Sequence, residues 1–224
     1  MGVISLERAD SLFWLGRYVE RVFTTVKVFF DYYDCMIDRN EREYIHFCEA
    51  LSIPNVYQDR EDFVKNYILD ESNPDSIISN MLRACDNAIV SRDDISTESM
   101  SYLEMCLQTI RAEKDSPAPV FALQSVIDHI YAFWGSIDDC ILDEENRNIV
   151  KCGRYVERLD LYLRLKFDQT LVEKEFRKFS KRLERVRIGY HAEQYQQVAA
   201  MMERKDEFES LRSSILNTLQ QIFC

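Results

Sequence analysis

Apolar residues recur along this chain at alternating steps of three and four positions, a spacing that gathers them on one stripe of an α-helix. The first stripe, in a helix expected over residues 6–37, consists of Leu12, Leu15, Val19, Val22 and Val26. Similar stripes predict a helix from about residue 41 and a short one over residues 59–69. The pair Asn73-Pro74 has the form of a helix start, with a capping residue before proline, and predicts a fourth helix.

The same spacing continues through the rest of the chain. One helix is expected after a cap at Ser96 or Thr97, one after the linker at residues 115–119, and one opened by the acidic run 143–145. A charged segment over 173–184 and an interruption at 188–190 precede one last amphipathic helix. No stretch alternates with period two. The pattern predicts a single all-α domain over residues 1–224, a multi-helix bundle with a core at 1–168 and a divergent helical tail at 169–224.

Composition narrows the class of protein. Only 5 Gly and 4 Pro among 224 residues favour long helices with few loops. A net charge of −11 argues against a general nucleic-acid or anionic-membrane binder. Residues 1–8 lack the features of a signal peptide, and no run is apolar enough to span a bilayer. Seven cysteines without a C-x-x-C pair are typical of free thiols, so we expect a cytoplasmic protein.

One hexapeptide occurs twice without change. Residues 16–21 and residues 153–158 both read Gly-Arg-Tyr-Val-Glu-Arg, inside flanks that have drifted. In each copy the two arginines and the glutamate share one helix face, opposite the apolar stripe. The prediction is therefore two equivalent helices within the bundle.

Three interpretations of this charged face remain open. It is a sheltered network between the two helices, in which Glu20 and Glu157 accept bidentate bonds from partner arginines and leave a spare guanidinium. Alternatively it binds a ligand, or it is an exposed set of ion pairs worth roughly 0.2–0.5 kcal/mol each. Gly16 and Gly153 cost about 1 kcal/mol within a helix, which close approach of two backbones would explain.

Ordered motifs over residues 4–168 resemble the alpha-E family of bacterial helical proteins with Glu-Arg motifs. They are residues 11–21, residues 73–77, residues 83–88 with Arg92-Asp93, and the second hexapeptide. Cys85-Asp86 stands where the family pattern has Arg-Glu, and the segment after Asp168 departs from it. The resemblance implies a setting beside ATP-grasp-type carboxylate–amine ligases, often with transglutaminase-like or Ntn-hydrolase proteins.

Two functional hypotheses follow from the hexapeptides and the resemblance. The first is a binding or accessory protein, without chemistry of its own, whose partner is an ATP-grasp-type ligase or a transglutaminase-like protein in peptide synthesis or modification. The second is a small-molecule or peptide-carboxylate site, enzymatic only with a partner; self-association is open under either. Its candidate ligand-binding residues are Arg17, Glu20, Arg21, Arg154, Glu157, Arg158 and Arg92.

Other groups in the sequence favour no catalytic or metal chemistry. Glu43 and His46 have the spacing of one helical di-iron ligand pair, but such a site needs a second pair and two further glutamates. The acidic residues near 138–145 are typical of a solvated helix terminus. No Gly-rich phosphate loop or nucleophile elbow occurs. We therefore expect no metal and no cofactor, and no catalytic residue is assigned.

Overall fold

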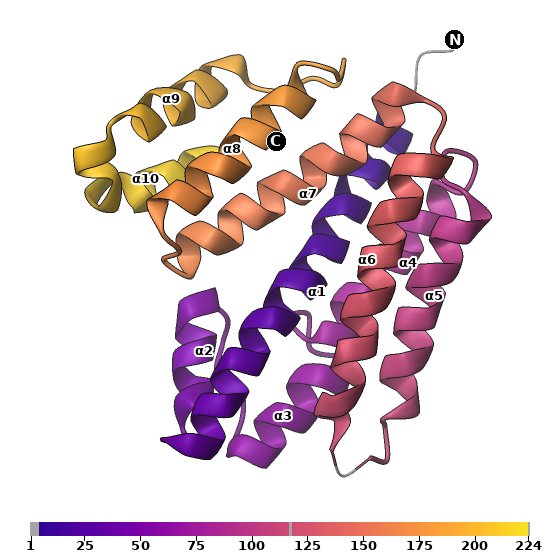
Figure 1. Cartoon of the computed structure of the whole chain (residues 1–224), viewed down its shortest axis with the longest axis vertical. Coiled ribbons are helices and arrows are strands. Elements are labelled where there is room, and N and C mark those ends of the chain that lie inside the picture. The colour runs from indigo at the N-terminus through magenta and orange to yellow at the C-terminus, as the bar shows by residue number, and fades with distance from the viewer. Residues whose placement is uncertain (1–4, 117, 224) are drawn as a thin grey trace.

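The chain is all-helical, as predicted. The structure is a computed structural model that describes residues 5–116 and 118–223, and the described residues contain no strand (Figure 1). The α-helices are α1 (Leu6–Asp38), α2 (Glu43–Leu51), α3 (Arg60–Leu69), α4 (Ile77–Val90), α5 (Thr97–Ala112), α6 (Leu123–Cys140), α7 (Glu144–Arg164), α8 (Gln169–Leu183), α9 (Ala192–Glu203) and α10 (Phe208–Leu219). Short 3-10 turns cover Pro119–Ala122 and Lys205–Glu207.

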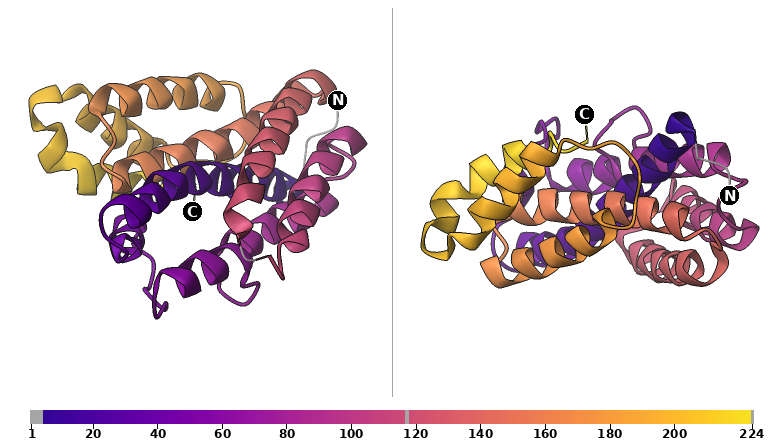
Figure 2. Two further views of the ribbon diagram at one scale, coloured as in Figure 1. Left: turned by 60° about the horizontal axis from the view of Figure 1, so that its bottom comes forward. Right: turned by 90° about the horizontal axis from the view of Figure 1, so that it is seen from above.

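Two helices from opposite ends of the sequence form the centre of the molecule. α1 packs most extensively against α7 on one side and α4 on the other, and α7 carries α8 and α10. Figures 1 and 2 show α8–α10 gathered at one end of the molecule and α4–α6 at the other. The two hexapeptides therefore lie on the helix pair that joins these groups.

The apolar stripes are the surfaces that bury this pair. All five stripe residues of α1 are fully buried, and their equivalents on α7 are at most 3% exposed: Ile149, Cys152, Val156, Leu159 and Leu163. Apolar side chains removed from water are the main favourable term in folding. The predicted stripes are thus confirmed as core.

Short polar side chains fix where most of the helices begin. Ser96, one of the two caps expected, caps α5 by accepting a backbone N–H bond. Asp143, at the start of the acidic run expected to open a helix, caps α7 in the same way. The prediction that Asn73 caps a helix beginning at Pro74 was wrong. Asn73 instead accepts the backbone N–H of Asp75 in a turn, and Ser76 caps α4, which begins at Ile77. An asparagine side chain that bonds its own backbone two residues on favours a turn over a helix.

The C-terminal segment differs in one respect from the expectation. The interruption at residues 188–190 is present, between α8 and α9. The single last helix is instead two, α9 and α10, which pack against each other across the Lys205–Glu207 turn. Charged residues fill that turn, and Phe208 and Met202 on either side are buried.

Three further expectations concern membrane spans, the cysteines and the residues outside the described part of the chain. No helix in the described part of the chain has the length and apolar character needed to cross a membrane. The cysteines within residues 5–116 and 118–223 are free thiols. Pro117 of the expected linker, the first four residues considered as a leader, and Cys224 lie outside the described residues.

Candidate functional site

The two hexapeptide glycines bring the backbones of α1 and α7 into direct contact. A Cβ atom on Gly16 would lie 2.0 Å from the backbone oxygen of Val150, and one on Gly153 would lie 2.0 Å from that of Phe13. Each contact is with the residue three positions before the partner glycine, so the crossing is reciprocal. Only glycine allows this approach, which explains its presence inside both helices.

Glu157 on α7 is held by both arginines of the α1 hexapeptide. Arg17 Nε donates to its Oε2 at 2.8 Å, and Arg21 Nε donates to its Oε1 at 2.5 Å. The glutamate side chain is 1% exposed. Both carboxylate oxygens are therefore used by charged donors from the partner helix.

Glu20 on α1 has the matching arrangement with the α7 hexapeptide. Arg158 donates to both of its oxygens, from Nε at 2.7 Å and from Nη2 at 2.8 Å, and Arg154 Nε donates to Oε2 at 3.2 Å. Thr24 adds a hydroxyl bond at 2.8 Å. Glu20 is fully buried. Four donors thus converge on one carboxylate away from water.

The pKa shifts show which charges the network stabilises. Burial alone would raise the pKa of Glu157, but Arg21 and Arg17 outweigh it and hold that pKa below its usual value. Burial would likewise lower the pKa values of Arg21 and Arg158, yet Glu157 and Glu20 respectively raise them. These groups are ion pairs stabilised as charged species.

Arg154 is the exception among the four arginines. Burial lowers its pKa more than the attraction of Glu20 raises it. The geometry agrees, because its single bond to Glu20 is the longest between the two hexapeptides. Its guanidinium instead rests on the ring of Trp134 from α6, 4.1 Å from the centroid, as Arg17 rests on Trp14 at 4.7 Å.

The predicted inter-helix network is therefore confirmed, with three differences. Only Glu20 accepts a bidentate pair from one arginine, because Glu157 accepts one bond from each of Arg17 and Arg21. No guanidinium is left spare, since all four bond a partner glutamate. A further acid, Glu175 of α8, bonds Arg158 at 3.2 Å. Arg92, the seventh candidate, lies apart from the network, exposed in the turn after α4.

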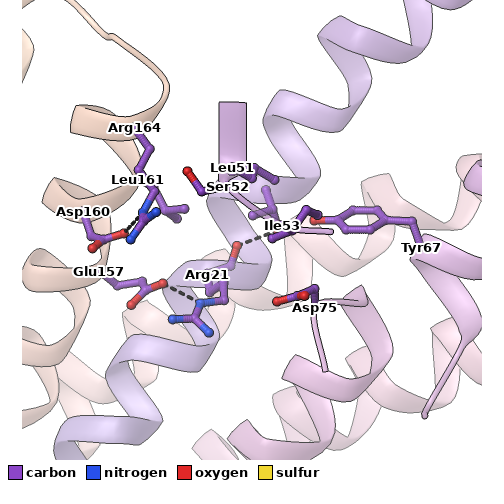
Figure 3. Close-up of a pocket in the computed structure, with 11 residues that line it drawn as sticks. Arg21, Leu51, Ser52, Ile53, Tyr67, Asp75, Glu157, Asp160, Leu161 and Arg164 are labelled. Carbon is purple, nitrogen blue, oxygen red and sulfur yellow. Dashed lines mark hydrogen bonds and ion pairs between the residues drawn. The ribbon is translucent and has the colours of Figure 1, made fainter. Parts of the chain in front are cut away.

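A cavity of about 200 Å³ opens beside one half of the network (Figure 3). Arg21 and Glu157 form its link to the hexapeptides, and Asp160 and Arg164 of α7 line the same wall. Arg164 Nε donates to Asp160 at 2.6 Å. On the far side of Arg21 from Glu157, Figure 3 shows Asp75. Leu51, Ser52, Ile53 and Tyr67 complete the lining together with Thr25 and Leu161.

Several of these residues carry no signal in the local sequence. Glu175, Trp134 and Asp75 come from α8, α6 and the turn before α4, and they meet the hexapeptides only through tertiary packing. Asp160 and Arg164 follow the second hexapeptide at helical spacing, so extending its charged face by two turns would have found them. Within residues 5–116 and 118–223, no group of three His, Cys, Asp or Glu side chains is placed to hold a metal ion.

Comparison with known proteins places this geometry in a family. Residues 7–221 match the Alpha-E profile, described as "a predicted alpha-helical domain with a conserved ER motif". The match also includes most of the segment after residue 168, whereas the motifs that carried the sequence resemblance covered only residues 4–168. No curated protein and no solved structure matches the chain. Because the profile spans nearly all of the sequence, and Glu-Arg pairs lock its two central helices, this chain belongs to the Alpha-E family.

Proposed function

We propose that this protein is a binding or accessory protein, without chemistry of its own, in a peptide synthesis or modification system built on an ATP-grasp-type ligase. The observation that carries the proposal is the internal use of the Glu-Arg motif. Its six charged side chains bond one another across α1 and α7. A motif used in this way builds a rigid platform between two groups of helices, as a binding protein requires.

The partner is the ligase suggested by the family resemblance, with a transglutaminase-like protein as the second choice. The surface available to it is acidic overall, since the chain carries a net charge of −11. Charge of one sign over a surface steers association with an oppositely charged partner and makes the rate salt-dependent. A basic face on the ligase is therefore the expected counterpart.

The test is co-elution of the purified chain with an ATP-grasp-type ligase from the same source. We expect a complex by size-exclusion chromatography with light scattering, weakened by added salt. A helical protein of similar size and net charge, unrelated in sequence, controls for nonspecific attraction. Separate elution at concentrations where circular dichroism shows both proteins folded would overturn the proposal.

A second candidate, a carboxylate-binding site, is favoured by the free edges of two arginines. Arg21 and Arg164 bond their own carboxylates through Nε, and in the described part of the chain their Nη nitrogens have no hydrogen bond. Both side chains keep some exposure, 31% and 22% respectively. Such edges suit a planar carboxylate.

Replacing either arginine by lysine tests this candidate, because lysine keeps the charge and loses the planar fork. Titration with N-acetyl-L-alanine, which offers a carboxylate without an amine, is expected to show weaker binding in Arg164→Lys. Unchanged binding in both variants would refute a carboxylate site at this position.

A further inference from the structure

The cavity beside Arg21 contains one carboxylate that the network does not use. Asp75 lines the cavity and is half-buried, and no hydrogen bond or ion pair engages its carboxylate among the described residues. Its backbone N–H donates to Asn73, which fixes its place in the turn before α4. A carboxylate that no donor bonds is available to a cationic group that enters the cavity.

The charges of the cavity are arranged as two poles. Arg21 and Arg164 approach from α1 and α7, and Figure 3 shows Asp75 on the other side of the Arg21 side chain. The C-terminal residue of α2, Leu51, and the two residues that follow it also border the cavity, and the C-terminal end of a helix carries partial negative charge. Glu157 and Asp160 bond these arginines through Nε only, so each acid offsets the charge of one arginine and leaves its Nη nitrogens as the available donors.

This polarity selects the ligand's charge pattern. A simple carboxylate would meet the Arg edges but face Asp75 without a counter-charge. A simple amine would pair with Asp75 but face two guanidinium groups. A neutral zwitterion satisfies both poles and leaves the charge balance of the buried network unchanged.

The size of the cavity limits the ligand further. Pockets for drug-sized ligands are typically about 300–1,000 Å³. This one is about 200 Å³, which leaves room for only a small side chain beside the charged groups of a ligand. We propose that the cavity binds a small free α-amino acid, its carboxylate on Arg21 and Arg164 and its ammonium on Asp75.

This inference rests on the carboxylate-binding candidate above and adds the ammonium subsite. It is independent of any ligase partner. Its probes are L-alanine, N-acetyl-L-alanine and L-alaninamide, titrated calorimetrically into the full chain. L-alanine is expected to bind about tenfold or more tightly than either blocked form, since each lacks one charge-assisted contact.

Asp75→Asn tests the ammonium subsite directly. L-alanine affinity is expected to fall about tenfold or more, while N-acetyl-L-alanine binding does not weaken. Asp86→Asn, the same change at an exposed position of α4 outside the cavity, is the matched control and should bind like wild type. The ligand comparison on the unaltered protein needs no variant, so the test stands even if Asp75→Asn folds poorly.

The outcomes separate the two proposals. Equal binding of L-alanine and N-acetyl-L-alanine, unaffected by Asp75→Asn, would overturn the amino-acid inference and leave the carboxylate site standing. No binding of L-alanine or N-acetyl-L-alanine would overturn both. Neither result bears on co-elution with the ligase, which tests the accessory role separately.

Discussion

Glu20 offers the sharpest test of what the Glu-Arg network contributes to stability. Substitution by glutamine keeps the shape of the side chain and removes its charge. Three N–H donors from Arg154 and Arg158 and one hydroxyl from Thr24 now converge on its two carboxylate oxygens. A glutamine offers one acceptor oxygen, and its NH₂ group would face guanidinium donors at the other position.

The expected cost follows from the burial of this cluster. Glu20 is fully buried, and the side chains of Arg154 and Arg158 are only 17% and 11% exposed. Breaking a buried ion pair by removing one partner typically costs about 3–5 kcal/mol, because the remaining charge stays buried without compensation. Typical domains have only about 5–15 kcal/mol of stability. Glu20→Gln should therefore remove a large part of the free energy of unfolding.

Urea and thermal unfolding followed by circular dichroism measure this effect. For a domain of this size, about 3–5 kcal/mol corresponds to a fall in Tm of roughly 6–20 °C. Glu71→Gln is the control, since Glu71 and its ion-pair partner Arg111 are both exposed, 51% and 49% respectively. The control should change stability by no more than about 0.5 kcal/mol. If Glu20→Gln lowers the free energy of unfolding no more than the control does, the network does not stabilise the helix pair as its geometry indicates.

Two further predictions concern the same helix pair. Gly153→Ala would place a Cβ 2.0 Å from an α1 backbone oxygen and should destabilise the protein by about 1–3 kcal/mol or more. Its control is Gly135→Ala in α6, where a Cβ would have nothing within 4 Å and should stabilise the protein by up to about 1 kcal/mol. Equal unfolding midpoints of the two variants in urea would contradict the close crossing. The pKa of Glu157 is lower in the folded state than its usual value of 4.5, so the folded protein binds fewer protons at this residue than the unfolded chain does. The stability that the charged Glu157 contributes is therefore present above about pH 4.5 and is lost as pH falls through the folded-state pKa. The free energy of unfolding measured from pH 7 to pH 3 should fall less steeply for Glu157→Gln than for wild type, and identical slopes would contradict this assignment.

The parts of the fold that the sequence predicted are those set by local physics. The stripe from Leu12 to Val26 depends only on helical periodicity, and all of its residues are buried. Caps act within three residues, and Ser96 is one of the two positions expected to cap its helix, while Asp143 lies in the acidic run expected to open the next one. The failure at Asn73-Pro74 is also local in origin, because the same two residues start helices and make turns, and Ser76 competes as the cap.

The candidate site was predictable only in its repeated half. Two identical hexapeptides indicate that their helices share an environment, and glycines in the middle of both helices indicate a close crossing. Nothing near Glu175, Trp134 or Asp75 in the sequence reveals that these side chains meet the hexapeptides. Their positions depend on how α8, α6 and the turn before α4 pack, which is a property of the whole fold.

The two halves of the network differ more in the residues that pack over them than in the bonds between the two hexapeptides. Each half has one buried glutamate between two arginines of the other helix, so the repeat alone would make them alike. On the Glu20 side, α8 supplies Glu175 to Arg158, which is 11% exposed. On the Glu157 side no second acid bonds Arg21 among the described residues, and Arg21 is 31% exposed and borders the cavity. A ligand that needs a guanidinium edge can therefore reach Arg21 and is excluded from Arg158. Within a motif that is symmetric in sequence, packing of α8 thus encloses the Arg158 half and leaves the Arg21 half accessible from the cavity.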